Sequence, residues 1–150
     1  MELINATPQQ RPAIISLLQS QKLPTEDLPQ VLDGFFTATA DGNVVGIIGL
    51  ERYGPYGLLR SMVVHPEYRS QGIAERLVAT LENYAAANGV ADIFLLTETA
   101  AGYFSKKAYA NVERSSVPAE VQASSEFSHV CPASAAVMVK KMNVNVYIAP

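Results

Sequence analysis

The sequence is poor in cysteine and histidine, which narrows the chemistry that it can support. Its 150 residues include one cysteine and two histidines. The single cysteine, Cys131, excludes an internal disulfide and is typical of a protein from a reducing compartment. Two histidines and one cysteine are too few for an ordinary zinc site, so we expect no bound metal.

Excess positive charge and long apolar runs are also missing. Eleven lysines and arginines stand against 14 aspartates and glutamates, which gives a formal net charge of -3. This balance argues against a nucleic-acid-binding face, because such faces gather lysine and arginine. No apolar run approaches the length of a membrane span, and the amino terminus lacks the pattern of a signal peptide. We therefore expect a soluble, cytoplasmic protein without nucleic-acid or membrane partners.

The sequence contains enough apolar residues to form one hydrophobic core. With 49% hydrophobic residues, a chain of this length can bury one core, whereas a second domain would be undersized. We therefore predict a single domain over residues 1–150, in which residues 143–150 form either an extra edge strand or a tail.

Apolar periodicity predicts the order of helices and strands. It indicates strands over 2–6, 35–40, 44–51, 56–64, 92–96, 109–114 and 135–142, and helices from Pro8 and over 26–32, 72–88 and 100–107. Asp41-Gly42-Asn43 predicts a hairpin turn, because Asp-Gly supplies the positive φ that such turns need. Residues 115–125 are interpreted as a loop. Meander strands followed by a crossover helix predict an α+β fold, with a mixed sheet of about six to seven strands, about four helices and one parallel pair.

Residues 63–74 combine features that suit a phosphate-bearing ligand. An apolar strand stops at Pro66, a short basic loop follows, and a helix begins near Gly72. The first N–H groups of a helix lack partners within the helix, and the macrodipole makes this end positive. Gly72 allows close approach of the backbone to a ligand, and Arg69 offers a planar guanidinium. A Rossmann-type nucleotide site is disfavoured, because the pattern contains one glycine and the early strands form a hairpin.

Two segments occur in the order and at the separation of a known family. The first is Arg69-x-x-Gly72-x-Ala74, and the second runs from Thr97 to Tyr109 and is similar to an Asn-x-x-Ala-x-x-x-Tyr-x-x-x-Gly-Phe pattern. Together they resemble the GNAT superfamily of acetyl-CoA-dependent N-acetyltransferases. The resemblance implies a GNAT-like fold with the parallel pair at a cofactor cleft. It also implies transfer of an acetyl group from acetyl-CoA to a primary amine of a small molecule, such as an amino-acid-like or toxic compound.

Three shorter segments resemble one branch of that superfamily. Leu59-Arg60-Ser61, Leu95-Leu96-Thr97 and the tail over 126–135 look like the acetyltransferases of arsenic-resistance operons. This finer resemblance favours small amines over protein tails as acceptors.

The resemblance assigns residues to the cofactor. They are Met62, Val63, Val64, Arg69, Ser70, Gln71, Gly72, Ile73, Ala74, Thr97, Phe104, Lys106 and Lys107. The backbone N–H of Val64 is expected to polarise the thioester carbonyl. Phe104 is the main departure from the family, because many members have a tyrosine there that protonates the leaving thiolate. A non-catalytic acyl-CoA-binding or sensing module is therefore the alternative function.

For the residues that would bind or deprotonate the acceptor amine, the sequence leaves alternatives open. Glu51 is the candidate base, against the alternative of an exposed acid at a strand end. Arg60 is either ion-paired with a glutamate or a clamp for an acceptor carboxylate, since an arginine in an apolar strand needs a partner when buried. Glu126 and His129 lie in the loop that the resemblance sets over the acceptor. An exposed carboxy-terminal strand could pair between subunits, so monomer and homodimer stay open.

Overall fold

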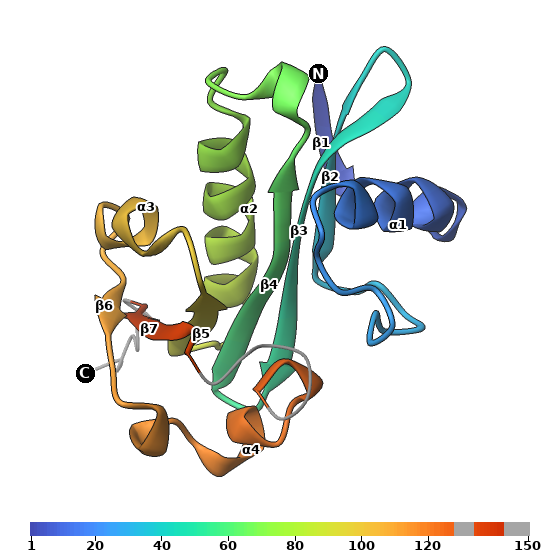
Figure 1. Cartoon of the computed structure of the whole chain (residues 1–150). Coiled ribbons are helices and arrows are strands. Elements are labelled where there is room, and N and C mark those ends of the chain that lie inside the picture. Colours follow the sequence, from blue (N-terminus) through green and yellow to red (C-terminus); the bar gives the residue numbers. More distant parts are fainter. Residues whose placement is uncertain (128–133, 143–150) are drawn as a thin grey trace, which may run out of the picture. The chain divides into compact units, whose positions relative to one another are not determined.

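Seven strands form one mixed sheet in the computed structural model, which describes residues 1–127 and 134–142. The strand order is β1-β2-β3-β4-β5-β7-β6. The strands are β1 (Glu2–Asn5), β2 (Phe35–Ala40), β3 (Asn43–Tyr53), β4 (Tyr56–Val64), β5 (Asp92–Thr97), β6 (Ala110–Asn111) and β7 (Ala136–Lys141) (Figure 1). The pair of β4 and β5 is parallel, whereas β1–β2, β2–β3, β5–β7 and β6–β7 are antiparallel. The predicted mixed sheet with a parallel pair is confirmed.

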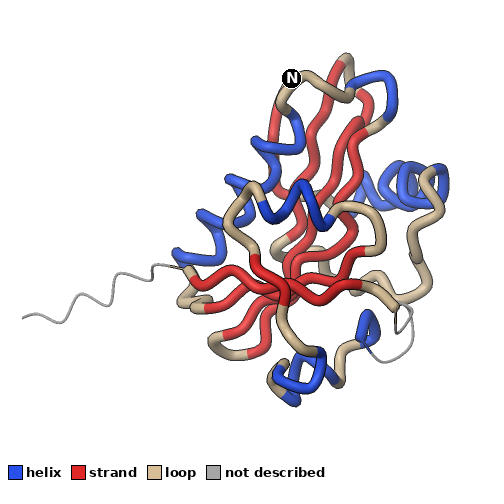
Figure 2. Tube along the Cα trace, turned by 60° about the vertical axis from the view of Figure 1, so that its left-hand side comes forward, coloured by secondary structure: helices blue, strands red, loops and turns tan. Residues whose placement is uncertain are grey.

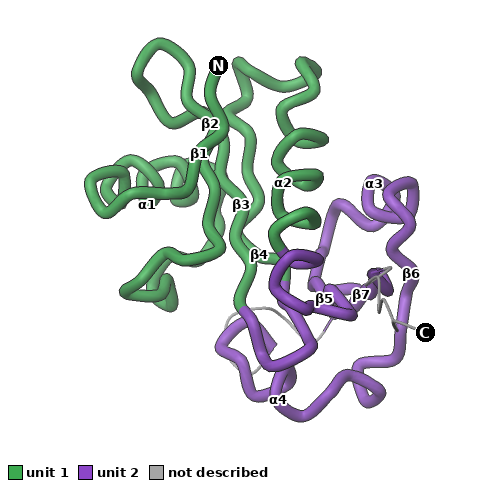
Figure 3. The backbone as a smooth tube through the Cα atoms, turned by 180° about the vertical axis from the view of Figure 1, so that it is seen from behind, with its two compact units in different colours: residues 1–51, 59–84 green, residues 52–58, 85–150 purple. Residues whose placement is uncertain are grey.

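α-Helices and short 3-10 helices connect these strands in residues 1–127 and 134–142. The α-helices are α1 (Arg11–Ser20), α2 (Ile73–Ala87), α3 (Ala101–Ser105) and α4 (Ala119–Gln122), and the 3-10 helices are η1 (Pro8–Gln10), η2 (Pro66–Tyr68) and η3 (Arg114–Ser116) (Figure 2). None of the helices in the described part of the chain is long and apolar enough to cross a membrane. The chain divides into two compact units, residues 1–51 with 59–84 and residues 52–58 with 85–150 (Figure 3).

In the first unit, α1 and α2 cover opposite faces of the strands (Figures 1 and 3). One core cluster joins Ile14, Leu17 and Leu18 of α1 to Phe35, Ile47 and Val63 of the strands. On the other face, a Cβ built on Gly46 would lie 3.1 Å from Leu77 Cδ1 and 3.3 Å from Ile73 Cγ2 of α2. Successive strand residues face opposite sides, so Ile47 meets α1 while Gly46 meets α2. A side chain at position 46 would therefore require these side chains of α2 to shift by a few tenths of an ångström.

The predicted turn between β2 and β3 is confirmed. Asp41 and Gly42 have φ of 51° and 79°, and Ala40 pairs with Asn43 across them. Positive φ at both central residues is the geometry of a type I′ hairpin, which matches the twist of the flanking strands.

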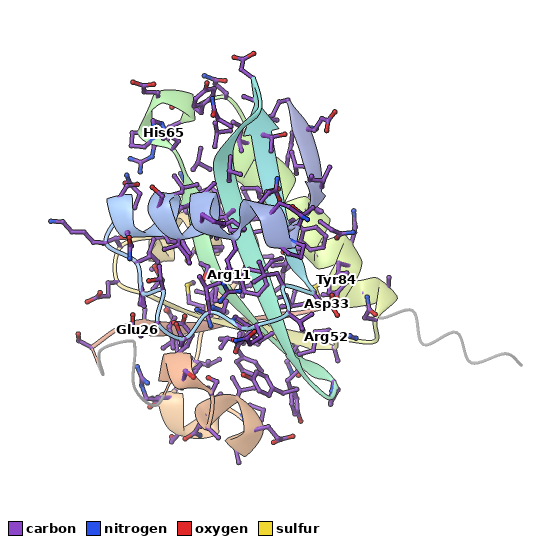
Figure 4. The ribbon with its side chains drawn as sticks, turned by 90° about the vertical axis from the view of Figure 1, so that its right-hand side faces the viewer. Arg11, Glu26, Asp33, Arg52, His65 and Tyr84 are labelled. Carbon is purple, nitrogen blue, oxygen red and sulfur yellow. The ribbon has the colours of Figure 1, made fainter. Side chains whose placement is uncertain are left out.

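The helix predicted over 26–32 is wrong. Residues 21–34 form turns and bends without a helix. Arg11 of α1, labelled in Figure 4, donates hydrogen bonds from its guanidinium to the carbonyls of Leu28 at 3.2 Å and Pro29 at 2.6 Å. Pro29 has no N–H for a helical bond. Since a side chain from another element takes the carbonyls, the local apolar pattern does not produce a helix.

The carboxy-terminal predictions need three corrections. The strand predicted over 109–114 is limited to β6, because Arg114 already belongs to η3. The segment 115–125 is not a plain loop, since it contains α4. Val121 of α4 is fully buried and belongs to a core cluster with Val117, Leu58 and Phe94. The helix predicted over 100–107 is shorter, and Ala108 has a left-handed φ of 72°. Residues 143–150, predicted as an edge strand or tail, lie outside the described residues.

Candidate functional site

The loop that leads into α2 is exposed in the first unit, at Ser70, Gln71 and Gly72. Ser70 and Gly72 have left-handed φ values of 64° and 79°. A Cβ built on Gly72 would meet no heavy atom within 4 Å. The N–H of Arg76 donates to the Gly72 carbonyl at 3.2 Å, which is the first turn of α2. The N–H groups of Ile73 and Ala74 precede this bond and therefore have no partner within the helix.

Arg69 is fixed next to the end of β4. Its Nε donates to the Val64 carbonyl at 3.2 Å, and its Nη2 donates to Gln21 Oε1 at 2.9 Å. Gln21 follows the last residue of α1. The guanidinium is thus held beside the strand end that precedes the start of α2, where it adds positive charge to that of the helix dipole.

The last residues of β4 present backbone groups at the edge opposite β3. The N–H of His65 donates to the Val45 carbonyl of β3 at 2.7 Å. Because successive backbone groups of a strand point to opposite edges, the N–H of Val64 points away from β3. The register of β4 with β5 ends at Leu58, which pairs with Phe94.

A buried arginine joins two acidic side chains in the same unit. Arg60 is 3% exposed. Its Nη1 lies 2.8 Å from Glu51 Oε2, and its Nη2 lies 2.9 Å from Asp27 Oδ1. Of the two alternatives for Arg60, the structure has the ion pair with a glutamate. A role of Arg60 in acceptor binding stays a prediction.

Arg60 also supports an unusual backbone conformation in β4. Ser61 is buried, has a φ of 58°, and its Oγ accepts a hydrogen bond from Arg60 Nε at 3.0 Å. A left-handed conformation costs a residue other than glycine about 1 kcal/mol or more, so its neighbours must hold it there. Sequence reasoning missed Asp27, which stands in no recognisable local motif, and it missed the left-handed conformation of Ser61.

Glu51, the candidate base, is not an exposed acid. Its side chain is 17% exposed and is oriented by the Arg60 guanidinium. His65, in contrast, has a structural role, because its Nδ1 accepts the Glu67 N–H at 3.1 Å and caps η2 (labelled in Figure 4).

The remaining predicted cofactor residues lie in the second unit. Thr97 Oγ1 accepts the Ala100 N–H at 2.9 Å and so closes a turn after β5. Phe104 is 5% exposed, and its ring centroid lies 5.2 Å from that of Tyr103 and 5.3 Å from that of Tyr109, both edge to face. Lys106 is exposed, and Lys107 Nζ lies 5.6 Å from the Tyr103 ring centroid.

Of the two candidate acceptor-binding residues in the carboxy-terminal loop, only Glu126 lies among the described residues. Glu126 is 8% exposed and belongs to the second unit. His129 lies outside the described residues, as does Cys131. Within residues 1–127 and 134–142, no three histidine, cysteine or acidic side chains gather in a way that could hold a metal ion.

Comparison with known proteins identifies the family. A model of the acetyltransferase (GNAT) family matches residues 8–111. The chain belongs to this family. An uncharacterized N-acetyltransferase of Chlorobaculum tepidum is 29% identical over 101 residues, which cover 67% of this chain and 64% of that protein. An amino-acid acetyltransferase of Aeromonas salmonicida is 26% identical over 99 residues, which cover 65% of this chain and 22% of that protein. This GNAT chain thus spans less than two thirds of the length of either relative.

A solved structure supports the GNAT fold. A protein of Mycobacterium tuberculosis, crystallised in complex with CoA and a second ligand, superposes with a TM-score of 0.80 at 23% identity. The match covers 95% of this chain and 99% of that one. The expected GNAT-like fold is therefore confirmed.

Proposed function

We propose that this GNAT protein transfers an acetyl group from acetyl-CoA to a primary amine of a small molecule. The observation that carries the proposal is the exposed loop that leads into α2. Gly72 has open space around it, and the N–H groups of Ile73 and Ala74 have no partner within the helix. A diphosphate needs N–H donors, positive potential and room for its oxygens. This segment supplies all three, and Arg69 adds a fixed cation.

The residues that follow the buried Ser61 are proposed to contact the rest of the cofactor. Residues 69–74 bind the diphosphate, while Met62, Val63 and Val64 line the pantetheine arm. When bound, acetyl-CoA supplies the activated acetyl group as a thioester. The N–H of Val64 points away from β3 and donates to the thioester oxygen, which stabilises the charge that develops there. On the resemblance alone, Thr97 and Phe104 lie near the cofactor, and Lys106 and Lys107 near its adenosine end.

Glu51 is proposed as the base that accepts a proton from the amine through a water molecule. A positioned proton transfer contributes about 10²–10⁴-fold to a rate. The bond from Arg60 supports this role, because it fixes the direction of the Glu51 carboxylate. Glu126 and His129 remain proposed contacts of the acceptor.

The alternative function is a non-catalytic acyl-CoA-binding module, and the position of Phe104 favours it. Phe104 cannot donate a proton, and its ring is packed against two tyrosine rings. We still prefer catalysis, because a thiol such as that of CoA has a pKa near that of cysteine, roughly 8.5, and leaves as a thiolate without a dedicated acid.

The proposal also covers the kind of acceptor, the branch of the family, the location and the oligomeric state. The amino-acid acetyltransferase relative favours an amino-acid-like acceptor. The segments Leu59-Arg60-Ser61 and Leu95-Leu96-Thr97 favour the branch of arsenic-resistance operons, with a toxic amine as acceptor. We take residues 1–150 as one acetyltransferase domain that acts in the cytoplasm. Its candidate oligomeric states are a monomer and a homodimer.

Two measurements test the proposal. The first follows thiol release from acetyl-CoA with a panel of primary amines and amino acids, and we expect release that depends on one group of amines. The second measures the melting temperature with CoA. A rise in melting temperature without thiol release from any amine would support the binding module instead. No rise at all would contradict both functions.

A further inference from the structure

Asp27 has a buried carboxylate oxygen that the fold does not use. The Asp27 side chain is 8% exposed, and its Oδ1 is bound by Arg60 Nη2 at 2.9 Å. Its other oxygen, Oδ2, is buried and has no hydrogen-bond partner among the described residues. A buried acceptor without a donor costs about 1–3 kcal/mol. Such an atom is explained when a ligand supplies the missing donor.

The charges around this atom indicate which kind of donor fits. Asp27 and Glu51 both bind the guanidinium of Arg60, so the three side chains have formal charges that leave one negative charge in excess. A third carboxylate in this place would be repelled. An ammonium group brings both a positive charge and N–H donors, and hydrogen bonds between charged groups are roughly twice as strong as neutral ones.

We propose that Asp27 Oδ2 binds the ammonium group of the acceptor amine. The inference rests on the proposed acetyl transfer and defines its acceptor as a cation that needs no carboxylate. Asp27 and Glu51 are bonded to the two Nη atoms of one guanidinium, so an ammonium on Asp27 lies close to the candidate base. Binding to Asp27 stabilises the protonated amine, and transfer of one proton to Glu51 through water then leaves the neutral nucleophile.

The same geometry argues against Arg60 as a clamp for an acceptor carboxylate. Its Nη1 donates to Glu51 Oε2 and to the Asp27 carbonyl, its Nη2 to Asp27 Oδ1, and its Nε to Ser61 Oγ. An incoming carboxylate would have to displace one of these partners. An ammonium on Oδ2 displaces none of them.

Access to Asp27 depends on the loop that contains it, which Arg11 and Arg60 hold by hydrogen bonds. Asp27 lies in the segment 21–34, which contains no helix or strand. The turn around it is closed by the Leu28 N–H, which donates to the Thr25 carbonyl at 3.2 Å. Because Oδ2 is buried, an ammonium would reach it only when neighbouring residues of this segment shift while Asp27 keeps its bonds to Arg60. Such a local shift leaves the strand pairs of the sheet intact.

The first test replaces the carboxylate and keeps its shape. Asp27→Asn retains an oxygen for Arg60 but turns Oδ2 into an N–H donor, which repels an ammonium. We expect KM for the best amine to rise about 10- to 100-fold, with a smaller change in kcat, because one charge-assisted bond is lost. The matched control is Asp33→Asn, the same change at an exposed acid of the same loop (Figure 4), which should leave KM unchanged.

The second test compares acceptors that differ in one group. Glutamate, methionine and phenylalanine are each offered as the free amino acid and as the α-amide, which keeps the ammonium and removes the carboxylate. Binding to Asp27 predicts lower KM values for the amides, whereas a carboxylate clamp at Arg60 predicts lower values for the free acids.

Calorimetric titration of the amides, with CoA present, separates this inference from the proposed function. Amide binding that is weakened by Asp27→Asn but not by Asp33→Asn supports the ammonium site, even when no thiol is released. Thiol release with the same KM in Asp27→Asn and wild type overturns the ammonium site and leaves acetyl transfer standing. If no amide binds to the wild type, the inference is wrong.

Discussion

Removal of Arg60 should destabilise the protein far more than removal of an ordinary arginine. Arg60→Met keeps an unbranched side chain of similar length but takes away the cation between Asp27 and Glu51, whose side chains are 8% and 17% exposed. It also removes the hydrogen bond to Ser61 Oγ. Breaking a buried ion pair by deleting one partner costs about 3–5 kcal/mol, because the other charge is left uncompensated.

Urea unfolding and thermal melting measure this loss. For a chain of 150 residues, each kcal/mol lowers the melting temperature by about 2–4 °C, so we expect a decrease of roughly 6–20 °C. The control is Arg76→Met at an exposed position of α2, which should change the free energy of unfolding by less than about 0.5 kcal/mol.

A double variant tests the electrostatic cause. Asp27→Asn added to Arg60→Met removes one of the two uncompensated charges, so the double variant should be more stable than Arg60→Met alone by at least about 1 kcal/mol. The reasoning is refuted if Arg60→Met costs less than about 1 kcal/mol, because the two carboxylates would then be well solvated without the arginine.

Three further changes test the proposed catalysis. Gly72→Glu should abolish the CoA-dependent rise in melting temperature, through bulk and like charge, whereas Gly72→Ala should keep part of it; full retention in Gly72→Glu would mean that the diphosphate binds elsewhere. Glu51→Gln should lower kcat about 10²–10⁴-fold and change the shape of the pH–rate profile, and an unaltered profile removes Glu51 from the mechanism. Phe104→Tyr should raise kcat, by up to about 100-fold, if protonation of the thiolate limits the rate; an unchanged kcat assigns the limit to another step.

The parts of the fold that the sequence predicted are those with local causes. The turn at Asp41-Gly42 follows from the φ preferences of two residues, and the positive φ values of both are found. Apolar periodicity predicted the helix over 72–88, and its apolar residues Ile73, Leu77 and Leu81 are buried in α2. The open start of α2 followed from one glycine after a strand end. In each case the deciding residues lie within a few positions of one another.

The parts that the sequence did not predict depend on distant partners. The loop over 26–32 is held by Arg11, which lies 17 and 18 positions from the carbonyls that it binds. Asp27 meets Arg60 across 33 positions. No local pattern contains such contacts, because they exist only after the strands have brought α1 and the loop together. The left-handed Ser61 is a similar case, since serine has no marked preference for that conformation.

The absence of a side chain at Gly46 of β3 lets the first turn of α2 pack close to that strand. Ile73, which is the first residue of α2, packs directly over that glycine. A larger side chain at position 46 would push on the Leu77 and Ile73 side chains, and Ile73 belongs to the turn whose amides are proposed to hold the diphosphate. If this turn binds the diphosphate as proposed, the affinity for CoA is also sensitive to an interior glycine 27 positions before Ile73.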